Sequence, residues 1–124
     1  MAVFGPGHDY SMVSIVDMSN AQYRCVIVQS AATVPLMLIA SQTLDPVVGI
    51  VQSKPQSGEA GRVRVSGISK VVAGAAVNGG NALQTNATGY AILSTDSRHA
   101  FGRALESVGS GGTFTAVIWG SVTL

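Results

Sequence analysis

The stretch GRVRVSGISKVVAGAAVNGGNALQTNATGYAIL, from Gly61 to Leu93, decides the fold class of this 124-residue chain. Glycine, asparagine and serine divide it into apolar or alternating runs that are too short for helices. Such runs, separated by turn-forming residues at intervals of about 8–12 residues, are typical of a small β-sandwich or β-barrel. The stretch therefore predicts an all-β fold and contains little reactive chemistry.

The rest of the chain continues this pattern of short strands, with turns at Ser19-Asn20 and Leu44-Asp45-Pro46 and a polar loop from Ser53 to Gly61. The residue before a proline is restricted to extended backbone, which favours the second of these turns. Residues 94–104 predict at most one short helix. We expect strands at Met12–Asp17, Tyr23–Gln29, Val34–Ile39, Val47–Gln52, Arg62–Ser66, Ile68–Val72 after a break at Gly67, Tyr90–Leu93, short ones around Val77 and Leu83, and a final, longest strand at Phe114–Leu124.

The length predicts one domain with one modest core, because a domain of this size buries roughly two-thirds of the surface of its unfolded chain. Gly5-Pro6-Gly7 interrupts regular structure near the start. We therefore expect an irregular N-terminal arm over residues 1–20 and a single β domain over residues 21–124.

The chain has little charge: 10% of its residues are charged, 47% are hydrophobic, and the net charge is +1. A surface with so few charges is suited to contacts with partner proteins. The seven basic residues are scattered and nearly balanced by six acidic ones, which argues against nucleic acid as a partner. Apolar runs such as Val34–Ala40 are far shorter than the roughly 20 residues that span a bilayer, and no signal peptide opens the chain. We expect no membrane partner and synthesis in a cytoplasm.

Two segments repeat each other at a constant offset of 53 residues, Gly49–Gly67 and Gly102–Gly120. Ser57-Gly58 falls on Ser110-Gly111, so each segment reads as a strand, a Ser-Gly turn, a second strand and a final glycine. The same turn chemistry at the same spacing predicts two similar hairpins.

The offset also carries the alternation of side chains from one hairpin to the other. Inward residues are Val63, Val65, Ala116 and Ile118, and outward residues are Arg62, Arg64, Ser66, Thr115, Val117 and Trp119. The outward side of the last strand is therefore apolar. Val117 and Trp119 are expected either to be covered by another segment or subunit, or, for Trp119, to close one end of the core.

The sequence predicts no catalytic, metal-binding or cofactor-binding residues, and therefore no enzyme. Ser94, Asp96 and His99 could suggest a hydrolytic triad, but triad members normally come from separate elements, and no nucleophile-elbow motif surrounds the serine. His8 and His99 are the only histidines, and neither has the spacing of a zinc site. Cys25 lies in an apolar run and is expected to be a core residue.

One segment is similar to a different class of protein. VAGAAVNGGNAL, from Val72 to Leu83, resembles the second-half turn of lipoyl- and biotin-carrying domains, which would make Lys70 the attachment lysine. In that family, however, the lysine lies on a hairpin tip tens of residues from this turn. A carrier domain is kept as an alternative.

A second resemblance covers most of the chain. Its pieces, in order, are DPVVGIVQ at Asp45–Gln52, SGEAGRVRVSGISKVVAGAAVNGG at Ser57–Gly80, ALQTNATGYAIL at Ala82–Leu93 and FGRALESVGSGGTFTAVIWG at Phe101–Gly120. This succession resembles the small capsid decoration, or cement, proteins of tailed bacteriophages. Residues 1–40 follow the pattern only loosely.

The resemblance implies a structural virion protein that binds the outside of an assembled head, with the major capsid protein as its partner, and stabilises it, commonly as a homotrimer. It implies no catalytic residues and no cofactor. Another structural role in the phage head, such as a fibre base, is the alternative within the same class.

The expected interface residues come from both ends of the chain. We expect the N-terminal arm to reach the capsid or a neighbouring subunit, the two arginines of the alternating strand to face solvent or a partner, and the last strand to form the subunit contact. These residues are, respectively, Phe4, Tyr10 and Met12, then Arg62 and Arg64, then Val117 and Trp119.

Overall fold

The structure, a computed structural model, describes residues 7–29, 33–43, 45–95 and 100–119, which form nine β-strands and no helix. The strands are β1 (Gly7–Ser14), β2 (Cys25–Val28), β3 (Leu36–Ile39), β4 (Gly49–Val51), β5 (Ala60–Val72), β6 (Ala82–Thr85), β7 (Ala91–Leu93), β8 (Gly102–Ala104) and β9 (Thr113–Ile118). The all-β prediction is confirmed.

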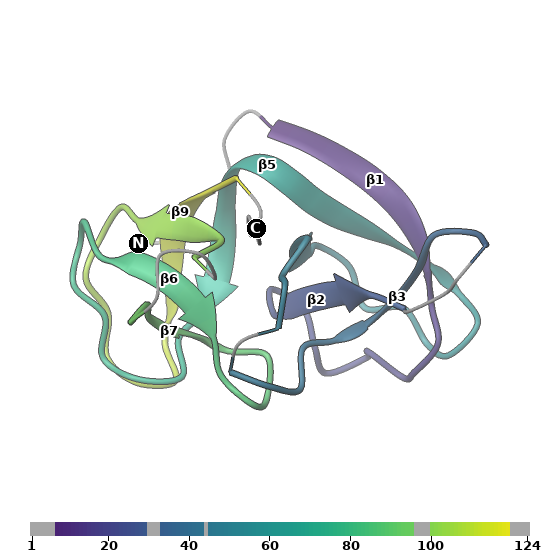
Figure 1. Cartoon of the computed structure of the whole chain (residues 1–124), viewed down its shortest axis with the longest axis horizontal. Helices are drawn as coiled ribbons and strands as arrows, with labels where there is room; N and C mark the ends of the chain where they lie inside the picture. Colours follow the sequence, from purple (N-terminus) through teal and green to yellow (C-terminus); the bar gives the residue numbers. More distant parts are fainter. Residues whose placement is uncertain (1–6, 30–32, 44, 96–99, 120–124) are drawn as a thin grey trace.

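The strands form two barrels that share β5. In the first barrel the order is β1-β3-β2-β4-β5, and β1 also pairs with β5, which closes the ring. In the second barrel the order continues β5-β9-β8-β6-β7, and a parallel bridge between Ala73 and Ala91 closes it. Figure 1 shows β5 curving from the lobe that holds β1, β2 and β3 into the lobe that holds β6, β7 and β9.

β5 is a single strand of 13 residues, whereas the sequence predicts two strands with a break at Gly67. The chain bends at Gly67, which has a φ of 104°, a conformation open to glycine because it has no Cβ. Up to Gly67 the strand pairs with β1 and β4, and beyond it with β9. One glycine therefore lets one strand serve both barrels.

Three further expectations differ from the structure. All eight residues of β1 lie within the predicted arm, residues 1–20, yet β1 pairs with β5 from Gly7 to Val13, and Asp9 there accepts hydrogen bonds from Arg64 of β5. Gly102–Ala104 is strand β8 and not helix, while residues 96–99 lie outside the described residues. β9 ends at Ile118 and is shorter than β5; residues 120–124 also lie outside the described residues.

The two predicted hairpins have the same register. The pair Ile50↔Arg64 between β4 and β5 becomes Arg103↔Val117 between β8 and β9, each number rising by 53. The turn glycines Gly58 and Gly111 have φ angles of 86° and 83°. The prediction of similar hairpins is confirmed.

The repeat extends to the whole of each barrel. β1, β2, β3, β4 and the first half of β5 correspond to the second half of β5, β6, β7, β8 and β9. Equivalent pairs are Ser14↔Met37 and Ala73↔Ala91, Val26↔Ile39 and Leu83↔Leu93, and Asp9↔Arg64 and Ile68↔Val117. Both barrels are thus versions of one five-stranded unit.

Equivalent core positions carry side chains of different size. Met37 of the first barrel lies over Gly61, where an added Cβ would be 2.6 Å from the Met37 Cε. In the second barrel the equivalents are Ala91 and Phe114, both fully buried. The large residue is Met37 on β3 in the first barrel and Phe114 on β9 in the second. The small one is Gly61 in the first and Ala91 in the second, so both interiors remain filled.

Tyr23 has a φ of 68°, in the left-handed region that L-residues other than glycine rarely adopt. The equivalent residue of the second barrel is Gly80, with a φ of 91°. The Tyr23 N–H donates to the Val51 carbonyl and the Gly80 N–H to the Ala104 carbonyl, both at 2.8 Å. Tyr23 packs against the core of the second barrel, and Lys70 Nζ lies 5.7 Å from its ring centroid. These contacts hold the strained residue at the junction.

We expect Tyr23→Gly to be more stable than Tyr23→Ala by about 1 kcal/mol, which reverses the usual order of these two residues in regular structure. Both variants remove the ring and its contacts, so their difference isolates the backbone conformation. Urea-induced unfolding of the two variants measures it. A Tyr23→Ala variant equal to or more stable than Tyr23→Gly would contradict a strained backbone at this position.

Candidate interaction surface

The residues expected at the N-terminal interface lie in different surroundings. Tyr10 projects from β1 with 65% of its surface exposed. Met12 belongs to the core cluster of the first barrel and is 9% exposed, so its side chain is not available to a partner. Phe4 lies outside the described residues.

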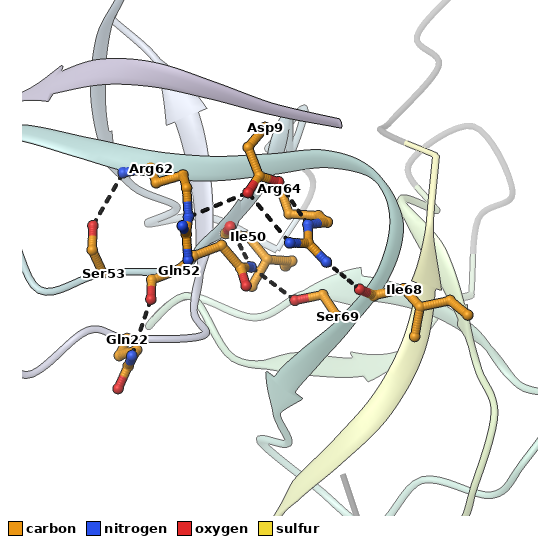
Figure 2. A network of polar contacts seen from close by, with 9 residues as sticks. All are labelled: Asp9, Gln22, Ile50, Gln52, Ser53, Arg62, Arg64, Ile68 and Ser69. Atoms are coloured by element: carbon orange, nitrogen blue, oxygen red, sulfur yellow. Dashed lines mark hydrogen bonds and ion pairs between the residues drawn. The ribbon is translucent and has the colours of Figure 1, made fainter. Parts of the chain in front are cut away.

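Arg64 and Asp9 form an ion pair that joins β5 to β1 (Figure 2). Arg64 Nε donates to Asp9 Oδ1 at 2.6 Å, and Nη2 donates to Oδ2 at 3.3 Å. Arg64 Nη1 also donates to the Ile68 carbonyl at 2.6 Å, across the bend at Gly67. Its side chain is only 11% exposed. Arg64 therefore joins the two barrels. The alternation had predicted that it faces outward into solvent, and this prediction is wrong.

Arg62 is the accessible member of the same group. Its Nε lies 3.2 Å from Asp9 Oδ2, and its side chain is 61% exposed. Between these two arginines lies Val63, which is fully buried as predicted. Of the two arginines expected to face a partner, Arg62 is the exposed one.

A second polar group ties β4 to the second half of β5. Gln52 is 3% exposed, and its Nε2 donates to the Ile50 carbonyl at 3.0 Å and to Ser69 Oγ at 2.8 Å. Gln22 Nε2 donates to the Gln52 carbonyl at 3.0 Å. Figure 2 shows this group beside the arginine–aspartate pair, on the inner side of the bend in β5.

Arg24 and Tyr90 make a further contact between the two barrels. The Arg24 guanidinium lies over the Tyr90 ring, 4.4 Å from its centroid, and also donates to the Tyr90 hydroxyl. The neighbouring Cys25 N–H donates to the Gly89 carbonyl at 2.8 Å.

Cys25 is fully buried, as predicted, and burial raises the pKa of its thiol to about 12. Such a thiol is protonated and inert near neutral pH.

The outward side of β9 carries apolar residues beside an arginine. Val117 pairs with Ile68 of β5 and with Arg103 of β8. The Arg103 guanidinium lies 6.0 Å from the Trp119 ring centroid, and Trp119 is 44% exposed. Leu105, two residues beyond Arg103, is 51% exposed. We call Ile68, Arg103, Leu105, Val117 and Trp119 the second-barrel face.

The predicted alternation of β9 holds for most of its residues. Ala116 and Ile118 are buried and face the core, and Val117 is half-buried. Thr115 is the exception, at 5% exposure, because its N–H and Oγ1 both donate to Glu106 Oε2, at 2.8 and 2.7 Å. Leu105 was missed by the sequence prediction, although its alternation with the inward Ala104 is a signal for an outward residue.

The described residues hold no group of three or more histidine, cysteine, aspartate or glutamate side chains that could bind a metal ion, and they form no pocket. No helix in this part of the chain is long and apolar enough to cross a membrane. Ser94 is described, whereas Asp96 and His99 lie outside the described residues. Lys70 lies within β5, two residues before its end and opposite Thr115, and not on the hairpin tip that a carrier domain requires.

Two barrels built on one continuous strand expose aromatic and aliphatic side chains on both, a surface suited to contacts with other proteins. The sequence model of the family described as Phage cement protein matches residues 16–119. The chain therefore belongs to the phage cement protein family and is a structural component of the phage head, not an enzyme. The predicted family resemblance is confirmed.

A solved structure has the same fold. The head fibre gp8.5 N base of bacteriophage phi29 superposes with a TM-score of 0.69 and 20% sequence identity, over 90% of this chain and 92% of that chain. No curated protein sequence matches the chain. At this level of identity the likeness concerns the fold alone.

Proposed function

We propose that the protein binds the outer surface of an assembled phage head, in contact with the major capsid protein, and stabilises it as a homotrimer. Membership of the phage cement protein family is the observation that carries this proposal. A protein of this kind requires a rigid scaffold and exposed apolar area for its partners. The junction of polar contacts around β5 supplies the first, and Tyr10 and the second-barrel face supply the second.

The two barrels suggest a division of contacts. We expect Phe4 and Tyr10 of the N-terminal segment to contact the capsid or a neighbouring subunit, and Arg62, exposed on the first barrel, to contact the capsid. We expect Val117 and Trp119 to contact a neighbouring subunit. Several weak contacts repeated around a trimer give avidity, so no single contact has to be strong.

The experiment adds purified protein to heads that lack it and measures sedimented protein and the temperature at which the heads break. We expect binding to raise this temperature and Tyr10→Ala to weaken binding about tenfold, as loss of an aromatic contact residue does. Gln42→Ala, at an exposed loop position, is the control and should bind normally. Wild-type protein that stays in the supernatant, or heads that break at an unchanged temperature, would refute the proposal.

A second candidate is the base of a head fibre, which the structural likeness to the phi29 head fibre base favours. Electron microscopy of heads with bound protein separates the two. A compact knob on each site supports a cement protein, and a fibre rising from the site supports a fibre base.

A further inference from the structure

The outward side of the first barrel is covered by the second barrel. Ile50 faces away from the first core, yet it is fully buried, because it packs into the core cluster of the second barrel. The covering segment is the beginning of the second half of β5. There, Arg64 donates to the Ile68 carbonyl and Gln52 to Ser69 Oγ.

The structural repeat gives each of these residues an equivalent. On the covered side, Ile50, Gln52 and Arg64 of the first barrel correspond to Arg103, Leu105 and Val117 of the second. The latter three belong to the second-barrel face, where Arg103 is exposed and Leu105 is 51% exposed. The second barrel thus presents to solvent the side that the first barrel buries.

The covering segment has an equivalent as well. Ile68 and Ser69 correspond to Asp9 and Tyr10, because the pair Asp9↔Arg64 repeats as Ile68↔Val117. Ser69 is buried against the first barrel, whereas Tyr10 is 65% exposed. The second barrel therefore has an uncovered face. The first barrel has, in β1 at Tyr10, an exposed segment that is equivalent to the one that covers such a face.

We propose that a second copy of this chain places its β1, at Tyr10, on the second-barrel face and so repeats between subunits the contact that joins the barrels within one. In this contact the equivalents of the hydrogen-bonded Gln52 and Ser69 are Leu105 and Tyr10. The polar internal pair becomes an apolar one, which suits the association of separate chains because burial of apolar area drives it. Trp119 and Tyr10 are residue types that often dominate interface energies.

The contact is head-to-tail, since different surfaces of the two copies meet. Such contacts close into a ring or continue as a filament. Closure at three copies rests on the homotrimer of the proposed function, whereas the contact itself does not. Because Tyr10 and Leu105 lie on opposite partners, one cysteine on each can report it.

The test mixes a Tyr10→Cys variant with a Leu105→Cys variant under mild oxidation. We expect a disulfide-linked 1:1 pair to form at least about tenfold faster than in a mixture of Thr88→Cys and Leu105→Cys, because binding raises the effective concentration of the two thiols. The native Cys25 is buried and does not compete. Light scattering should show wild-type oligomers, and a lower mass for Tyr10→Asp and for Leu105→Asp, each checked for native circular dichroism.

A pair rate equal to the control, or a wild-type protein that is monomeric at every concentration tested, would overturn the contact. So would a wild-type dimer that does not grow further, because that indicates a two-fold symmetric interface. Wild-type protein that forms trimers and stabilises heads, but whose cysteine pair forms no faster than the control, overturns this contact alone. Protein that passes them and does not bind heads overturns the proposed function alone.

Discussion

Arg64→Met is expected to lower the free energy of unfolding by about 3 kcal/mol. The substitution leaves the partly buried Asp9 carboxylate with the exposed Arg62 as its remaining arginine partner, and it leaves the Ile68 carbonyl without the Nη1 donor. Removing one member of a buried ion pair costs about 3–5 kcal/mol, and the partial exposure of Asp9 places this one at the lower end. Urea-induced unfolding measures the change.

Arg62→Met is the matched control for this prediction. The Arg62 side chain is 61% exposed, and exposed ion pairs contribute about 0–1 kcal/mol. Equal losses in the two variants would contradict the structural role of Arg64. The double variant Asp9→Asn with Arg64→Met should recover part of the loss, because it no longer leaves a carboxylate without its main partner.

Phe114→Ala is expected to destabilise the protein by about 3–5 kcal/mol, the range for truncating a buried aromatic side chain. Phe114 is fully buried in the core of the second barrel, which also contains the small Ala91. Phe114→Leu keeps most of the volume and should cost about 1.5 kcal/mol. Thermal and urea unfolding of both variants provide the measurement.

The structural repeat supplies a sharper version of this experiment. Phe114→Gly combined with Ala91→Met copies the arrangement of Gly61 and Met37 in the first barrel. Ala91→Met alone should destabilise by overpacking, by about 1–3 kcal/mol, but in the double variant it should restore stability relative to Phe114→Gly. Additive losses would show that the two barrel cores are not interchangeable in this way.

Local features of the chain were predictable from sequence because turn chemistry is local. The Ser-Gly turns at Gly58 and Gly111 specify hairpins, and the alternation around Val63 and Val117 specifies which side chains face outward. The second-barrel face could therefore be located in part from sequence. Its residues Val117 and Trp119 follow from alternation along a single strand.

The features that escaped prediction depend on contacts between distant residues. The Asp9 partner of Arg64 lies 55 residues earlier in the chain, so alternation alone made Arg64 an outward residue. Met12 is buried because β1 closes a ring with β3 and β5, which no local pattern indicates. Gly67 was interpreted as a break, because the residue type alone does not distinguish a glycine that ends a strand from one that bends it.

The bend at Gly67 has one more consequence, for distances on a larger scale. No linker separates the barrels, because the residues on either side of Gly67 are paired in β5, and Arg64 and Gln52 bind across the bend. The spacing between Tyr10 on the first barrel and Trp119 after the second is therefore fixed by the fold. The protein can therefore bind two sites at once, one through each barrel, only where those sites are separated by this fixed distance.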